Sequence, residues 1–211
     1  MGGVSSQAKA RLCRCVRLSG NRVLRVPSRE LVILNCAPAQ VWDRTTGELL
    51  GVRKGHTAVV RCVASRGKKI VSGGQDMSVR VWSLDTWKCL AVLEGHTGVV
   101  RGVAIQGDVV VSCSQDTSVR VWSVRGKREK RVLQGHDADV RGVALSGDGL
   151  TAVSCSFDKS VVVWDVKKGI LRERHEGHTD KVFGVALDRK GTRAVSCSWD
   201  MSLRVWDTGR L

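Results

Sequence analysis

Short runs of valine, isoleucine and leucine, separated by glycine-rich and polar turns, dominate the hydrophobic pattern of the chain. Residues 99–105, 109–113 and 119–122 are three such runs in succession, and the chain has only two prolines. Apolar runs of four to eight residues that are rich in valine and bounded by turn residues are typical of β-strands. We therefore predict an all-β protein built from many short strands.

This pattern of strands occurs four times. A Gly-His pair precedes each copy, and its histidine is followed by a tryptophan 26 or 28 residues later. The histidines stand 40, 40 and 42 residues apart. A repeat of about 40 residues that begins with Gly-His and ends in Trp-Asp or Trp-Ser is the signature of a four-stranded propeller blade. On these residues the chain resembles the WD-repeat (WD40) β-propeller family over about three quarters of its length.

The resemblance implies blades stacked side by side, four full repeats and one degenerate repeat. We place a flexible basic tail at 1–11, the degenerate repeat at 12–43, and the full repeats at 44–83, 84–123, 124–165 and 166–211. The degenerate repeat lacks Gly-His but offers apolar runs at 31–34 and 41–43. The last repeat ends after its third strand, so we expect its blade to lack a fourth.

Seven blades would require roughly 290 residues, more than the 211 present. Three arrangements are open. Residues 48–52 could complete the last blade and close a small four-bladed ring. The degenerate repeat could form a fifth blade and leave an incomplete propeller, which we favour. The chain could also be part of a longer protein or assembly, because an unclosed propeller exposes sheet edges to other chains.

Each full repeat contains His, Ser, Asp and Trp in fixed register. The family resemblance implies that they form a buried chain of hydrogen bonds from indole to serine to imidazole to carboxylate. The same residue types make a hydrolase triad, but four copies without a nucleophile elbow favour the structural interpretation. We predict no enzyme activity and no cofactor. The four tetrads are His56, Ser72, Asp76, Trp82; His96, Ser112, Asp116, Trp122; His136, Ser154, Asp158, Trp164; and His178, Ser196, Asp200, Trp206.

Two other repeat positions carry the predicted partner-binding surface. In WD-repeat proteins a residue early in the first strand and the residue before the repeat Asp point to the upper face. These positions hold Arg61, Arg101, Arg141 and Phe183, and Gln75, Gln115, Phe157 and Trp199. Two residues before the first position stand Val59, Val99, Asp139 and Lys181. Arginine binds carboxylate or phosphate with two hydrogen bonds, and aromatic rings provide anchors for a partner. The alternative is a solvated rim, or pairing of the arginines with Asp139 and its neighbours.

The second and third full repeats look like those of F-box/WD-repeat substrate receptors, which hold phosphorylated peptides with arginines at this position. No F-box is visible in residues 1–40. The hypothesis is therefore a scaffold that binds protein partners through acidic or phosphorylated segments, without a role in ubiquitin transfer.

The formal net charge of +15 favours acidic partners. A nucleic-acid-associated subunit, for instance in ribosome assembly, is the alternative, but only two Phe and no Tyr are present to stack on bases. The basic run at residues 127–131 is predicted to be a lower-face loop. It could contact RNA or direct nuclear import, but a solvated turn is favoured.

The N-terminal residues match the pattern for myristoylation at Gly2. Cys13 and Cys15, among nearby basic residues, could accept a second lipid, and one chain alone anchors only marginally. A chance match is the alternative, so membrane association is expected only if Gly2 is modified. Cys13 and Cys15 lack a second ligand pair for zinc, and no metal site is predicted.

The cysteines of the repeats occupy one position, at Cys113, Cys155 and Cys197, where the first full repeat has Gly73. There a cysteine acts as a small buried apolar residue. Because these positions belong to separate blades, we expect no disulfide among them. We therefore predict a reducing, intracellular location, cytoplasmic or nuclear.

Overall fold

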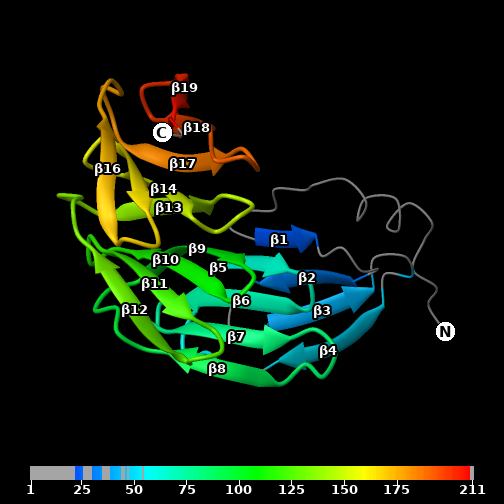
Figure 1. Ribbon diagram of the computed structural model, residues 1–211. Coiled ribbons are helices and arrows are strands. Elements are labelled where there is room, and N and C mark those ends of the chain that lie inside the picture. Colours follow the sequence, from blue (N-terminus) through cyan, green and yellow to red (C-terminus); the bar gives the residue numbers. More distant parts are fainter. Residues whose placement is uncertain are drawn as a thin grey trace.

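The computed structural model describes residues 22–25, 30–34, 39–43, 46, 48–53 and 55–209, and the side chains of residues 46, 48 and 55–209. The described residues form nineteen strands in five antiparallel sheets, each built from consecutive strands (Figure 1). These residues contain no helix, and hence no helix that is long and apolar enough to span a membrane. The all-β prediction is confirmed.

Four of the sheets have four strands and the last has three. The first contains β1 (Arg22–Arg25), β2 (Glu30–Leu34), β3 (Ala39–Asp43) and β4 (Leu49–Arg53). The second contains β5 (Val60–Arg66), β6 (Lys69–Gly74), β7 (Val79–Ser83) and β8 (Cys89–Leu93). The third contains β9 (Val100–Gln106), β10 (Val109–Ser114), β11 (Val119–Ser123) and β12 (Arg128–Leu133). The fourth contains β13 (Val140–Leu145), β14 (Thr151–Ser156), β15 (Val161–Asp165) and β16 (Ile170–His175). The fifth contains β17 (Val182–Leu187), β18 (Arg193–Ser198) and β19 (Leu203–Asp207).

The sheets stack as blades, with their first strands adjacent. Strand β9 contacts both β5 and β13, and β13 also contacts β17, while β1 and β2 contact β5. Residues 49–53 pair with β3 inside the first sheet. The alternative in which residues 48–52 complete the last blade is therefore wrong, because that segment is already the fourth strand of a fifth blade. The arc is open at β18 and β19.

The second strand of each blade shows what stacking does to burial. All six residues of β14 are buried, because neighbouring blades cover both of its faces. In β18 buried and exposed residues alternate along most of the strand, since only one face is covered. Val163 in β15 is 0% exposed, whereas Val205, at the same position of the last blade, is 68% exposed. Val195 and Leu203 lie on this same uncovered face and are exposed as well.

A Cys–Gly pair fills the space between the first two strands of each of the four full repeats. Gly102 lies opposite Cys113, and a Cβ added at Gly102 would come 2.8 Å from the Cys113 Sγ. In the second blade the pair is reversed, so Cys62 in β5 faces Gly73 in β6. The cysteine thus lies on the first strand instead of the second, and its sulfur atom still fills the space next to the glycine. This explains why Gly73 replaces the cysteine of the other repeats.

The burial predicted for the repeat cysteines holds in two of three cases. Cys113 and Cys155 are buried, and burial raises the pKa of the Cys155 thiol. Cys197 is exposed, because no blade covers that face of β18. None of the three cysteines forms a disulfide.

The basic run at residues 127–131 is not the loop that we predicted. Strand β12 begins at Arg128, so four of the five residues belong to the outermost strand of the third blade. Arg128 pairs with Ser123 of β11, and only a short turn separates the two strands. Backbone pairing with β11 extends the strand through a polar sequence that has little β-propensity of its own.

Candidate functional site

The structure brings the four members of every tetrad together. In the third blade Trp122 Nε1 donates to Ser112 Oγ at 2.8 Å, and Ser112 Oγ lies 2.7 Å from His96 Nε2. His96 Nδ1 lies 2.7 Å from the Asp116 carboxylate. The same three contacts measure 2.7–2.9 Å in the other full blades. With a hydrogen on Nδ1, each imidazole donates to Asp and accepts from Ser, so every buried polar atom of the tetrad is satisfied.

A fifth residue belongs to each of these networks, and the sequence analysis missed it. Ser118 Oγ donates to the Asp116 carboxylate, and the Ser118 backbone N–H donates to it at 3.0 Å. Ser78, Ser160 and Ser202 occupy the same place in the other full blades. The signal was present in the sequence, because an Asp-x-Ser triplet occurs in all four copies.

The tetrads control the ionisation of their carboxyl groups. Burial by itself would raise the pKa of Asp116, but hydrogen bonds from His96 and Ser118 outweigh it and hold that pKa well below its usual value. The pKa of Asp158 is lowered in the same way by His136 and Ser160. Burial lowers the pKa of His56, which keeps that imidazole neutral at pH 7. The Asp is therefore the charged member, stabilised by several donors.

The serines of the tetrads are closed to substrates. Each serine is no more than 2% exposed, at Ser72, Ser112, Ser154 and Ser196. Its hydroxyl donates to the imidazole and accepts from the indole of the same tetrad. A nucleophilic serine needs an accessible oxygen beside an oxyanion hole. These groups therefore stabilise the blade rather than react.

A β-bulge explains why one position of the first strand points to the upper face. Between β13 and β14, Val140 pairs with Ser156 and Gly142 with Cys155, which leaves Arg141 as the extra residue. Arg61, Arg101 and Phe183 are the extra residues of the equivalent bulges. A bulged residue leaves the regular alternation of the strand, and its side chain is redirected.

The three arginines at this position have different surroundings. Arg61 is exposed, and Gln75 beside the repeat Asp of the same blade is half-buried. Arg101 donates to the Gln115 side chain at 3.3 Å and lies 3.7 Å from the Asp139 carboxylate. Pairing with Asp139, the alternative raised from the sequence, therefore applies to Arg101.

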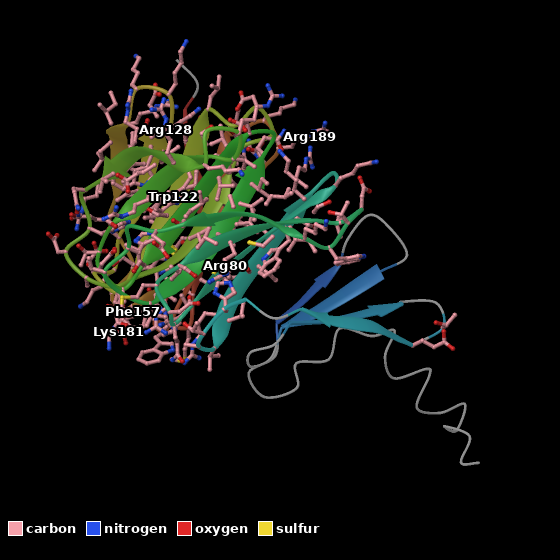
Figure 2. The ribbon with its side chains drawn as sticks, turned by 90° about the horizontal axis from the view of Figure 1, so that it is seen from below. Arg80, Trp122, Arg128, Phe157, Lys181 and Arg189 are labelled. Carbon is pink, nitrogen blue, oxygen red and sulfur yellow. The ribbon has the colours of Figure 1, made fainter. Side chains whose placement is uncertain are left out.

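Arg141 instead belongs to a compact group with three aromatic rings and a lysine, which we call the upper-face cluster. Its members are Arg141, Phe157, Lys181, Phe183 and Trp199. Phe183 lies 5.1 Å from Phe157 and 4.6 Å from Trp199, measured between ring centroids. The Arg141 guanidinium lies 4.7 Å from the centre of Phe157, and the Lys181 ammonium lies 5.1 Å from that of Trp199. Phe157 and Lys181 lie at the opposite end of the molecule from Arg128 (Figure 2).

Four of these five residues were predicted to bind a partner, whereas Lys181 was noted in the sequence without a role. Lys181 lies directly before β17, and its ammonium group is 5.0 Å from the centre of Phe157 and 5.1 Å from that of Trp199. Phe157 is half-buried, because Phe183 packs against it, whereas Trp199 is 59% exposed. The cluster thus has a partly covered aromatic base, one open indole and two cations resting on ring faces.

Several predictions lie outside the described residues. They are the lipid acceptor Gly2 and the pair Cys13 and Cys15. Within the part of the chain that the structure does describe, no group of three or more His, Cys, Asp or Glu side chains is arranged to hold a metal ion.

Comparison with known proteins agrees with the repeat pattern. A protein-family model described as WD domain, G-beta repeat matches residues 47–83, 87–123, 127–165 and 169–207. Each matched segment contains strands two and three of one full blade and the Trp of its tetrad. A search of curated protein sequences finds no match to the chain.

Proposed function

The chain belongs to the WD-repeat family, whose members serve in general as protein-interaction scaffolds, and from that premise we propose that its upper-face cluster binds acidic or phosphorylated segments of partner proteins. Binding of protein partners is the general role of the family, whereas the preference for anionic segments is inferred from the residues of the upper-face cluster. Fold alone does not specify a partner.

The observation that carries the proposal is the pairing of Arg141 and Lys181 with three rings. A cation over an aromatic face is held in place by the ring quadrupole, and guanidinium and ammonium groups carry several N–H donors for an anionic acceptor. Lys181 lies 5.0 Å from the centre of Phe157, so both cations share one ring. Two positive charges in one place favour an anionic ligand and disfavour a cationic one, such as methylated lysine.

The exposed indole of Trp199 supplies the second half of a binding surface. Aromatic side chains and arginine are the residues most often found as energetic anchors of protein interfaces. A partner residue with a large apolar side chain beside its acidic group would cover Trp199 while the acidic group meets Arg141 and Lys181. Arg61 and Gln115 extend the same face toward the earlier blades.

The phosphopeptide preference rests on this geometry alone. No comparison supports the resemblance of the middle repeats to F-box/WD-repeat substrate receptors. Moreover, Arg101 is engaged by Asp139. We therefore propose that Arg141 and Lys181 bind the acidic group, rather than a row of three equivalent arginines.

The experiment compares binding of a fluorescent nine-residue peptide, with and without one phosphoserine next to leucine, by anisotropy. The double variant Arg141→Gln/Lys181→Gln should bind the phosphopeptide at least about tenfold more weakly, since charge-assisted hydrogen bonds contribute about 1.5–3 kcal/mol each. The matched control Lys68→Gln/Arg125→Gln removes the same charge from exposed side chains elsewhere. Equal losses in the two double variants would show that only net charge matters and would refute the site.

A salt titration separates this function from the alternative of a nucleic-acid subunit. Binding of single-stranded RNA through its phosphates should weaken steeply with salt and ignore sequence. If RNA binds more tightly than the phosphopeptide, and the upper-face double variant does not change its affinity, the nucleic-acid alternative is favoured.

A further inference from the structure

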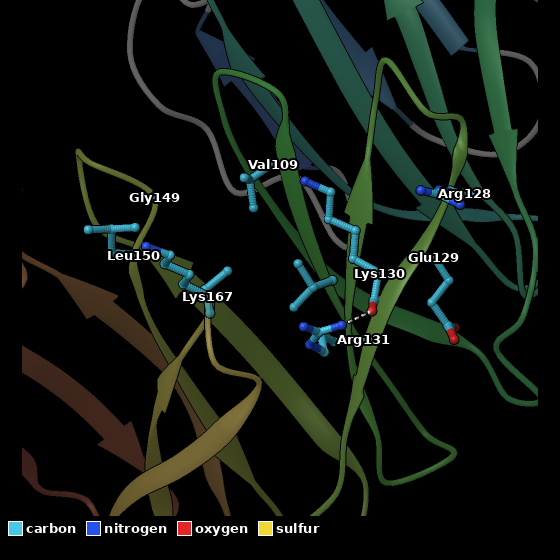
Figure 3. A pocket seen from close by; sticks show the side chains of 10 residues that line it. Val109, Arg128, Glu129, Lys130, Arg131, Gly149, Leu150 and Lys167 are labelled. Atoms are coloured by element: carbon cyan, nitrogen blue, oxygen red, sulfur yellow. Dashed lines mark hydrogen bonds between the residues drawn. The ribbon is translucent and has the colours of Figure 1, made fainter.

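A groove on the lower side of the molecule, between the third and fourth blades, forms a second surface with its own chemistry. We call it the lower groove; its volume is about 540 Å³. Lys130 and Arg131 of β12 line one wall, and Leu150 and Lys167, from the turns beside β14 and β15, line the other (Figure 3). Arg128, which also lines it, lies at the opposite end of the molecule from Phe157 and Lys181 (Figure 2).

The floor of the lower groove is aliphatic. Val121 and Val166 are buried at its base, and Val109 is half-buried beside them. Leu150 stands at the edge with 51% of its surface exposed. Ligand sites combine such an apolar lining with a few polar groups that set orientation. An aliphatic side chain placed between Leu150 and Val109 would remove apolar surface from water on both partners.

The rim of the lower groove is positively charged. Arg128, Lys130, Arg131 and Lys167 are all exposed there. The one acidic lining residue, Glu129, is bonded to Arg120. Asp108 is engaged by the Ser123 hydroxyl and the Arg125 backbone, each at 2.7 Å. Among the described residues, no ion pair within 4.0 Å involves Lys130, Arg131 or Lys167, so their charge is available to a ligand.

Arg131 is held both by its own strand and by the neighbouring blade. Its Nη1 donates to the backbone oxygen of Lys130 at 3.0 Å. A Cβ added at Gly169 would come 2.6 Å from the Arg131 Cδ, so the stem of the arginine lies against that turn. A stem fixed in this way loses less conformational entropy when its guanidinium binds an anion.

We propose that the lower groove binds an extended acidic peptide segment that carries one aliphatic side chain. The aliphatic side chain seats between Leu150 and Val109, and its flanking carboxylates meet Lys130, Arg131 and Lys167. A peptide fits better than a nucleic acid, because no aromatic ring lines the groove for bases to stack on. This site assigns a role to the basic run at residues 127–131, and it does not depend on the upper-face proposal.

The test measures binding of a fluorescent nine-residue peptide of Asp and Glu with one central leucine, alongside the same peptide with central alanine. The leucine peptide should bind at least about fivefold more tightly, which requires burial of little more than one of the three additional carbons of leucine. Leu150→Ser should abolish that difference and leave the alanine peptide's affinity within about twofold. Equal binding of the two peptides to the unmodified protein would overturn the proposal, because charge alone would then explain the binding.

The charge requirement has a matched control. Lys130→Glu/Lys167→Glu should weaken binding of the leucine peptide at least about tenfold. The control Lys68→Glu/Lys88→Glu makes the same change of charge at exposed positions outside the groove. Arg141→Gln/Lys181→Gln should also leave affinity within about twofold, which keeps this result separate from that of the upper-face cluster. The site is refuted if either control weakens binding as much as the groove variant, or if single-stranded RNA of equal charge competes more strongly than the peptide. All the altered side chains of the groove are exposed, and thermal unfolding checks that each variant is folded.

Discussion

Removing the Asp116 carboxylate tests whether the tetrads hold the blades together. In Asp116→Ala, His96 Nδ1, the Thr97 backbone N–H and both donors of Ser118 lose their acceptor. His96 and Ser118 are buried, and each buried donor left without a partner costs about 1–3 kcal/mol. The Ser118 hydroxyl lies 3.3 Å from His96 Nδ1 and can accept its hydrogen instead. The two Ser118 donors still lose their acceptor, so the expected loss is at least about 1–3 kcal/mol.

The measurement is unfolding in urea, followed by tryptophan fluorescence. For a denaturant dependence of about 2 kcal/mol per molar, the midpoint of Asp116→Ala should fall by about 0.5–1.5 M. The control is Asp85→Ala, which removes an exposed carboxylate whose partner is Lys68 at 3.0 Å. An exposed ion pair contributes about 0–1 kcal/mol, so its midpoint should shift by less than about 0.5 M. If the two variants unfold at the same urea concentration, the tetrads do not stabilise the blades and the reasoning is wrong.

Three further predictions concern packing and pH. Val163→Ala should lower the free energy of unfolding by about 1.5–3 kcal/mol, whereas Val205→Ala, the same change on the uncovered face, should cost under about 0.5 kcal/mol; equal losses in urea unfolding would contradict the difference in burial. Gly102→Ala should lower the free energy of unfolding by about 1–3 kcal/mol, because its Cβ meets the Cys113 sulfur. In the double variant with Cys113→Ala, the loss of unfolding free energy should be smaller than the sum of the two single losses by at least about 0.5 kcal/mol. Strict additivity in a double-mutant cycle would show that the two sites do not compete for space. The folded-state pKa of His56 lies below 6.5, so the unfolded chain binds more protons and the stability of the protein should fall as the pH drops below about 6.5. The stability should fall again below about pH 4, because folding also lowers the pKa values of Asp76, Asp116 and Asp158. Urea midpoints at pH 7, 5.5, 4 and 3 measure both steps, and His56→Asn should reduce the first. A midpoint that rises on acidification would reverse the assigned sign.

Much of the architecture could be predicted because each blade is specified within one repeat. The tetrad of the third blade joins residues no more than 26 positions apart, so its spacing is visible without any knowledge of the other blades. The alternation of strands and turns is equally local. The extent of β12 could not be found in this way, because pairing with β11 overrides the polar character of residues 128–131.

The predicted binding residues show the limit of the same approach. Arg61, Arg101 and Arg141 occupy one position of the repeat, and the sequence alone treats them as equivalent. Asp139 of the next blade engages Arg101, whereas rings from the fourth and fifth blades surround Arg141. Lys181 joins the cluster only because two blades meet there. Contacts between blades therefore decide the surroundings of each arginine.

The repeat, the inner three strands of the full blades and the buried polar tetrads could be predicted from the sequence, because these depend on residues close together in one unit. Which copies of the same side chain are covered depends instead on the contacts between blades. Val163 and Val205 have the same place in the repeat, yet one is 0% and the other 68% exposed. Burial is a property of two surfaces in contact, and a repeat carries information about only one of them.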